Sequence, residues 1–254
     1  MNRKLNILLT NDDGIHAPGL AALEQAFAPY AETLTVAPMH EQSGTGHSIT
    51  LNRPIRVREV REGGRHGYAV EGTPSDCVKF GVTKLSKKRP DAVISGVNPG
   101  GNIGINVLYS GTVSAALEAY SLGIPAIAVS INGFKNLHFD FAAEAAVKVA
   151  LGCIKSGRPV LVNMNIPDIP PEKIKGIKAT TMGRSRFEET FRERADPRGH
   201  TYYWLDGEMT DRHPDAQSDY WALDNDYISL TPLQLNLTDK NNLKFCRKLA
   251  ASLD

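Results

Sequence analysis

The strongest constraint on the fold is a regular alternation of short apolar runs and longer amphipathic segments over the first two-thirds of the chain. Runs typical of strands occupy residues 5–10, 33–37, 55–60, 67–70, 91–95, 126–130 and 160–165. Segments with helical periodicity lie at residues 19–30, 75–85, 112–122 and 139–155. Strands that alternate with helices of roughly 10–15 residues are typical of βαβ units. We therefore expect an α/β fold with a doubly wound, mostly parallel, Rossmann-like sheet.

The pattern changes after residue 174, which predicts a second region. Short strands are expected at residues 176–181, 200–205 and 227–231, with a last helix at 241–253. We expect an α/β catalytic core at residues 1–174 and a β-rich C-terminal extension at residues 175–254, whose final helix packs on the core. The strand at 200–205 carries Tyr202, Tyr203 and Trp204. Isolated hairpins are only marginally stable in water, so this strand needs a surface, either a second subunit or its own sheet.

Composition restricts the partners and the compartment. The 254 residues carry a formal net charge of +1, so no overall field favours polymeric nucleic acid or an anionic membrane. The three cysteines stand far apart in the sequence, which is typical of a reducing compartment. The apolar run before Asp12 is too short for a secretion signal, and no run approaches the roughly 20 apolar residues of a membrane span. We expect a cytoplasmic protein.

Two adjacent carboxylates follow the first predicted strand, in the sequence Asn11-Asp12-Asp13-Gly14. In an open α/β sheet, ligands bind outside the carboxyl ends of the strands. Two neighbouring carboxylates at such a position repel each other unless a cation lies between them. This favours a metal site at Asp12 and Asp13, although a solvated turn with a helix cap stays possible from the residues alone.

Three further loops leave strand ends with unusual polar residues. Residues 41–46 include Ser43, and residues 95–104 combine glycines with Asn98 and Asn102. Residues 109–112 open a helix, where Ser110, Gly111 and Thr112 form either an ordinary N-cap or an anion site. Carboxylate, hydroxyl and amide oxygens together favour Mg²⁺ or Mn²⁺ over zinc. The loops predict a divalent cation beside a phosphate-binding helix start.

Other known motifs that could explain these loops each require a residue or spacing that this chain lacks. A phosphatase of the haloacid dehalogenase type needs an aspartate nucleophile where this chain has Asn11. A response-regulator receiver needs an aspartate at the end of the third strand, where Ser95 stands. The glycine-rich loop at residues 95–104 is neither a Walker A motif nor GxGxxG, since the lysine and the glycine spacing are absent.

The motifs in order resemble the stationary-phase survival protein family, SurE. The resemblance rests on Asn11-Asp12-Asp13-Gly14 with Ala17-Pro18-Gly19, Gln42-Ser43-Gly44, Gly72-Thr73-Pro74-Ser75-Asp76-Cys77-Val78, Ser95-Gly96-Val97-Asn98 and Tyr109-Ser110-Gly111-Thr112-Val113. Asp196-Pro197-Arg198-Gly199, Tyr203-Trp204 and Ser229-Leu230-Thr231-Pro232-Leu233 extend it into the last third. It therefore covers nearly the whole chain.

The resemblance implies a 5′/3′-nucleotidase that acts on nucleoside monophosphates, with some activity on short polyphosphate. It implies one divalent cation, Mg²⁺ or Mn²⁺, held by Asp12, Asp13, Ser43 and Asn98, of which Asp12, Asp13 and Asn98 are expected to be catalytic. It places phosphate contacts at Asn102, Ser110, Gly111 and Thr112. Asp12 is the better candidate than Asp13 for orienting the attacking water. A non-enzymatic nucleotide sensor remains the alternative.

The resemblance also implies a homodimer or homotetramer, because the C-terminal arms of the family embrace a neighbouring subunit. The chain departs from the family pattern at two positions. An acidic residue is expected at Asn106, and a glycine at Asp226. The first departure lies near the expected phosphate site, and neither is an expected metal ligand.

Overall fold

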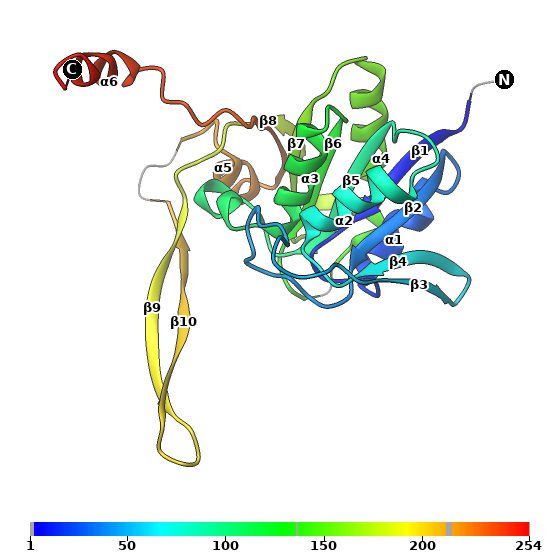
Figure 1. The fold of residues 1–254 in the computed structure, drawn as a ribbon, viewed down its shortest axis with the longest axis horizontal. Coiled ribbons are helices and arrows are strands. Elements are labelled where there is room, and N and C mark those ends of the chain that lie inside the picture. The colour runs from blue at the N-terminus through cyan, green and yellow to red at the C-terminus, as the bar shows by residue number, and fades with distance from the viewer. Residues whose placement is uncertain (1–2, 136, 212–214, 254) are drawn as a thin grey trace.

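The computed structural model describes residues 3–135, 137–211 and 215–253, and its core is one nine-stranded sheet (Figure 1). The strands are β1 (Leu5–Thr10), β2 (Ala31–Pro38), β3 (Val57–Glu62), β4 (Arg65–Val70), β5 (Ala92–Pro99), β6 (Ala126–Asn132), β7 (Leu161–Pro167), β8 (Gly176–Ala179) and β11 (Tyr227–Pro232). Their order across the sheet is β3-β4-β2-β1-β5-β6-β7-β11-β8. All neighbours from β4 to β7 are parallel, while β3 and β11 join antiparallel.

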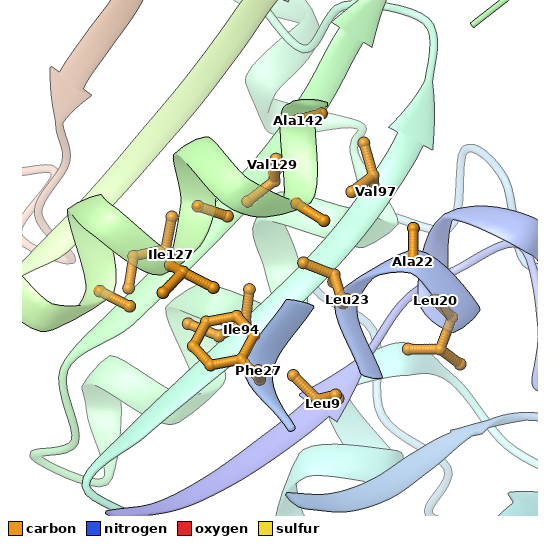
Figure 2. Close-up of a cluster of buried hydrophobic side chains, with 14 of the residues drawn as sticks. Leu9, Leu20, Ala22, Leu23, Phe27, Ile94, Val97, Ile127, Val129 and Ala142 are labelled. Atoms are coloured by element: carbon orange, nitrogen blue, oxygen red, sulfur yellow. The ribbon is translucent and has the colours of Figure 1, made fainter. Parts of the chain in front are cut away.

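Helices cover both faces of this sheet, which confirms the doubly wound α/β fold. Helices α1 (Pro18–Phe27) and α4 (Phe139–Lys155) pack on one face, where Leu23 and Phe27 of α1 and Ala142 of α4 meet Ile94 and Ile127 of the sheet (Figure 2). Helices α2 (Pro74–Phe80) and α3 (Gly111–Ser121) supply the second hydrophobic cluster. Both faces of the central strands are therefore buried, as their continuous apolar runs require.

Local sequence signals account for where these helices begin. Pro18 occupies the first turn of α1, where its missing N–H costs nothing. Thr73 accepts from the backbone N–H of Asp76, and the Asp76 carboxylate accepts from that of Thr73, which forms a capping box at α2. Ser110 caps α3 by accepting from the N–H of Val113. The chain continues past α2 as a π-helical turn, Gly81–Leu85, and 3-10 helices lie at Gly104–Leu108 (η2) and Pro171–Lys173 (η3).

A long hairpin projects from the body of the molecule (Figure 1). Its strands, β9 (Arg186–Ala195) and β10 (Thr201–Thr210), pair antiparallel with each other in a separate two-stranded sheet. The expected strand at residues 200–205 is thus the first half of a longer one. Neither β9 nor the short helix α5 (Asp219–Asp224) is expected from the sequence.

The other strands of the C-terminal region join the main sheet. Strand β11 pairs antiparallel with β7, and β8 pairs parallel with β11 at the sheet edge. We expected the final helix to pack on the core, but α6 (Leu243–Ala250) has no buried residue and stands away from the body (Figure 1). None of the helices that the structure describes is long and apolar enough to cross a membrane.

Candidate functional site

A cavity of about 570 Å³ opens beyond the carboxyl ends of β1 and β5, at the edge where sheets of this kind bind ligands. It lies beside all four loops singled out from the sequence, the last of which is the start of α3. Its lining residues are Asp12, Ser43, Gly44, Asn98, Pro99, Gly100, Gly101, Asn102, Asn106, Tyr109, Ser110, Phe134, Glu189 and Leu205. Five of the predicted site residues, namely Asp12, Ser43, Asn98, Asn102 and Ser110, therefore share one cavity.

Asp12 is buried at the start of helix α3. Its Oδ1 accepts a hydrogen bond of 2.6 Å from the hydroxyl of Thr112. Gly111 makes this approach possible, because a Cβ there would lie 2.7 Å from the Cβ of Asp12. Burial raises the pKa of Asp12, and the hydrogen bonds from Thr112 oppose that rise. The helix start thus fixes the carboxylate, and Gly111 is required for the fit.

Of the two carboxyl groups, that of Asp13 is the less readily ionised. Its Oδ2 is buried and lacks a hydrogen-bond partner among the described residues. Burial, followed by the charges of Asp12 and Glu41, raises its pKa to about 7. A buried carboxylate without a donor is unfavourable unless a proton or a cation compensates its charge. This orphaned oxygen is what a bound divalent cation would satisfy.

Two neutral oxygens complete the expected ligand set. Asn98 lies at the end of β5, after an irregularity in its pairing with β6, and its Nδ2 donates to the carbonyl oxygens of Pro99 and Gly100 at 3.0 and 2.7 Å. These bonds fix the amide orientation and leave its oxygen available. Ser43 lies across the cavity on an exposed loop, where its hydroxyl donates to Glu41 Oε1 at 2.7 Å.

The donor chemistry fits a hard divalent cation. Asp12, Asp13, Ser43 and Asn98 offer only oxygen, which Mg²⁺ and Mn²⁺ prefer. Within the described ranges, no three His, Cys, Asp or Glu side chains gather as a metal cluster. A cation here therefore depends on two carboxylates supplemented by neutral hydroxyl and amide oxygens.

Asn102 is held by a polar network at the ends of β6 and β7. Its backbone N–H donates to Asn165 Oδ1 at 2.8 Å, and its Nδ2 donates to Ser130 Oγ at 2.8 Å. Its carbonyl oxygen accepts from Nδ2 of Asn163 and of Asn165. The backbone amide of Asn102 is therefore already bonded within the protein. Sequence reasoning missed this network, although polar residues at the ends of two otherwise apolar strands were a visible signal.

The expected phosphate residues of α3 divide into two roles. Ser110 lines the cavity and caps the helix, while Thr112 is fully buried and its hydroxyl is committed to Asp12. The first turn of a helix carries N–H groups without intrahelical acceptors and a partial positive charge. The start of α3 is thus an electrostatically suitable place for an anion, immediately beside the acidic pair.

Phe134, Glu189 and Leu205 in the outer wall of the cavity were not anticipated, whereas Tyr109 and Asn106 lie in or near segments singled out from the sequence. Tyr109 and Phe134 are exposed aromatic residues, and Phe134 lies in the loop after β6 with 80% of its surface accessible. Leu205 and Glu189 reach the same cavity from the hairpin. Asn106, where the family resemblance leads one to expect an acid, also lines it. Only tertiary structure brings these five residues together, since they come from four separate segments.

Known proteins resemble this chain over nearly its whole length. The family described as Survival protein SurE matches residues 7–189. The "5′-nucleotidase SurE" of Moorella thermoacetica is 46% identical over 97% of this chain and 95% of its own length. That of Syntrophobacter fumaroxidans is 45% identical over 92% of this chain and 95% of its own.

A solved structure agrees with the fold as well. The crystal structure of SurE from Aquifex aeolicus superposes with a TM-score of 0.83 at 39% identity, covering 96% of this chain and 99% of that one. The family model includes the acidic pair after β1, the cavity loops and the first four residues of β9. The chain belongs to the SurE family.

Proposed function

We propose that this protein is a metal-dependent phosphomonoesterase that hydrolyses nucleoside 5′- and 3′-monophosphates to nucleoside and phosphate. The observation that carries the proposal is the meeting of Asp12, Ser43 and Asn98 around one cavity, beside the unpartnered carboxylate of Asp13. Relatives at 45–46% identity that bear the name 5′-nucleotidase support it.

One divalent cation, Mg²⁺ or Mn²⁺, would be held by Asp12, Asp13, Ser43 and Asn98. When bound, such an ion polarises a phosphoryl oxygen and lowers the pKa of a water molecule. The two carboxylates match its charge, which removes the repulsion between them. Thr112 fixes one oxygen of Asp12, so the other is available to orient the attacking water.

The start of α3 would neutralise the phosphate. Ser110, Gly111 and Thr112 begin the helix at the cavity, and the helix dipole favours negative charge there. This stabilisation grows as charge spreads over the phosphoryl oxygens in the transition state. In this proposal Asn102 orders the neighbouring loop through its bonds to Ser130 and Asn165, and contacts phosphate only through its side chain.

The nucleoside would occupy the outer part of the cavity. About 570 Å³ is within the roughly 300–1,000 Å³ of pockets that enclose a drug-sized ligand, so the cavity accommodates more than a phosphate group. The exposed rings of Tyr109 and Phe134 provide flat apolar surfaces on which a nucleobase can stack. We further propose a homodimer or homotetramer in the cytoplasm.

Phosphate release from AMP, 3′-AMP and a sugar phosphate tests the proposed function. We expect turnover of both nucleotides with Mg²⁺ or Mn²⁺, loss of turnover with excess chelator, and recovery when either ion is restored. The sugar phosphate should be the poorer substrate, because it lacks a base to stack on the aromatic wall. Full activity in excess chelator contradicts the mechanism, and nucleotide binding without turnover identifies a sensor instead.

A further inference from the structure

Glu189 is an acidic residue on the wall of a cavity that would receive an anion. It lies on strand β9, four residues after Ser185, whose carbonyl oxygen accepts from the N–H of Ile105 at 2.9 Å. The neighbouring Gly104 N–H and the Gly183 N–H both donate to the buried carboxylate of Asp219, at 3.0 and 2.9 Å. These bonds join the root of the hairpin to helix η2, so the position of Glu189 beside the cavity is structurally fixed.

The charges of the cavity are unusual for a nucleotide site. Among its lining residues that the structure describes, Asp12 and Glu189 are charged, and none is Lys, Arg or His. Within the described part of the chain, the Glu189 carboxylate has no ion-pair or hydrogen-bond partner. Sites that bind nucleoside triphosphates surround the additional phosphates with Lys, Arg and metal ions. This cavity instead presents a negative charge on its outer wall.

The charge balance is adequate for a single phosphate group only. In the proposed function a divalent cation would compensate Asp12 and Asp13, and the start of α3 would supply a partial positive charge for one phosphate. Each further phosphate of ADP, ATP or tripolyphosphate adds negative charge that no lining cation compensates. Like charges that face each other in a partly enclosed site repel more strongly than in bulk water.

We propose that Glu189 is a specificity-determining residue that disfavours substrates with more than one phosphate group. The inference rests on the proposed phosphatase function and adds a substrate preference to it. The hairpin thereby contributes a residue to the site in addition to any role in assembly. Short polyphosphate is a poorer substrate than a nucleoside monophosphate for the same reason.

The test compares kcat/KM for AMP, ADP, ATP and tripolyphosphate in the full-length protein, with the activating ion in excess. We expect Glu189→Gln to raise the ATP-to-AMP ratio of kcat/KM by about three- to tenfold, and Glu189→Lys to raise it further. Glu193→Gln is the matched control, because Glu193 lies on the same strand and the same hairpin face but outside the cavity. It should leave the ratio unchanged.

Ionic strength gives an independent readout that needs no variant. Salt screens exposed charges, so discrimination against ATP by the unmodified protein should weaken as salt increases, and less so in Glu189→Gln. Unchanged ratios in both Glu189 variants, an equal shift in Glu193→Gln, or salt-independent discrimination would overturn the inference while AMP turnover persists. Absence of AMP turnover in the unmodified protein with every divalent ion would overturn the proposed function as well.

Discussion

Asp13 is the residue at which stability and function oppose each other. Its pKa of about 7 lies well above the usual 3.8 of an aspartate, because burial and the charges of Asp12 and Glu41 disfavour ionisation. Between those two pH values the folded protein retains a proton that the unfolded chain has lost. The unfolded state then binds fewer protons, so the stability of the metal-free protein falls as pH rises through this interval.

We predict that Asp13→Asn removes this contribution to the pH dependence. The metal-free variant should melt at a higher temperature than the unmodified protein at pH 8, and at a similar temperature at pH 4. Mn²⁺ should raise the melting temperature of the unmodified protein more at pH 8 than at pH 5, because protons compete with the cation. It should have little effect on the variant.

Activity provides the second half of that test. Asp13→Asn should lower kcat by more than about 100-fold. That loss exceeds the roughly 10- to 100-fold loss typical when a residue that only contacts a metal ligand is replaced. Thermal unfolding followed by circular dichroism, together with phosphate release, checks both effects. A variant that unfolds would show that the acidic pair has a structural role, and one that melts with the same pH dependence as the unmodified protein would show that Asp13 does not cause that dependence.

Asp226 is a second residue that limits stability, in this case through its backbone conformation. It is the one non-glycine residue in the described ranges with a positive φ, at 66°, and it follows helix α5 where its N–H donates to the carbonyl oxygen of Leu223. This conformation suits glycine, the residue that the family resemblance leads one to expect at this position. The Asp226 carboxylate also pairs with the exposed Lys175 at 3.0 Å, a contact of small energetic value.

We therefore predict that Asp226→Gly stabilises the protein by about 0.5–1 kcal/mol. Relief of the left-handed backbone strain exceeds the loss of an exposed ion pair and the greater freedom of glycine in the unfolded chain. Urea unfolding measures the difference, and Lys175→Ala isolates the contribution of the ion pair. A decrease in stability for Asp226→Gly larger than that of Lys175→Ala would contradict the prediction.

At the scale of elements, the sequence predicts those strands whose limits are determined by the burial of hydrophobic residues. Strands β1, β6 and β7 are apolar runs buried on both faces, so their limits agree with the expectation to within about two residues. Strand β9 carries charged residues at six of its ten positions and has no buried residue, and its pairing with β10 is what makes it a strand. Helix α5 has only six residues, too few to show a helical periodicity in the sequence.

The candidate site was likewise predictable only in part, namely where its residues lie at the ends of strands. Asp12, just after β1, and Asn98, at the end of β5, reach the cavity because parallel strands end at one edge. Glu189 and Leu205 reach it through a hairpin whose root is fixed by bonds to η2 and α5, and no local pattern encodes those bonds. Phe134 is an isolated exposed aromatic in a loop, and sequence offers no reason to distinguish it from other surface residues.

At the scale of the whole molecule, the hairpin exposes large apolar side chains on the face that also carries Glu189 and Glu193. Side chains alternate between the two faces of a strand, so the pairs Phe187–Met209, Phe191–Leu205 and Glu193–Tyr203 share one face. Phe191, Tyr203 and Leu205 are each more than half exposed. Helix α6 likewise exposes Leu243, Phe245 and Leu249. Apolar surface presented on two projecting elements is typical of subunit interfaces.

We predict that the purified protein is at least a dimer and that this hairpin face holds it together. Light scattering at micromolar concentration should give a mass of at least twice the 27.7 kDa of one chain. Phe191→Asp should lower that mass, because it replaces a large exposed apolar side chain of this face with a further charge, which opposes burial against another subunit. Trp204→Asp is the control on the opposite face of β10, and it separates loss of this face from general disruption of the hairpin. A mass near 27.7 kDa for the unmodified protein would exclude the assembly, and an unchanged mass for Phe191→Asp would place the interface elsewhere, with α6 the next element to test.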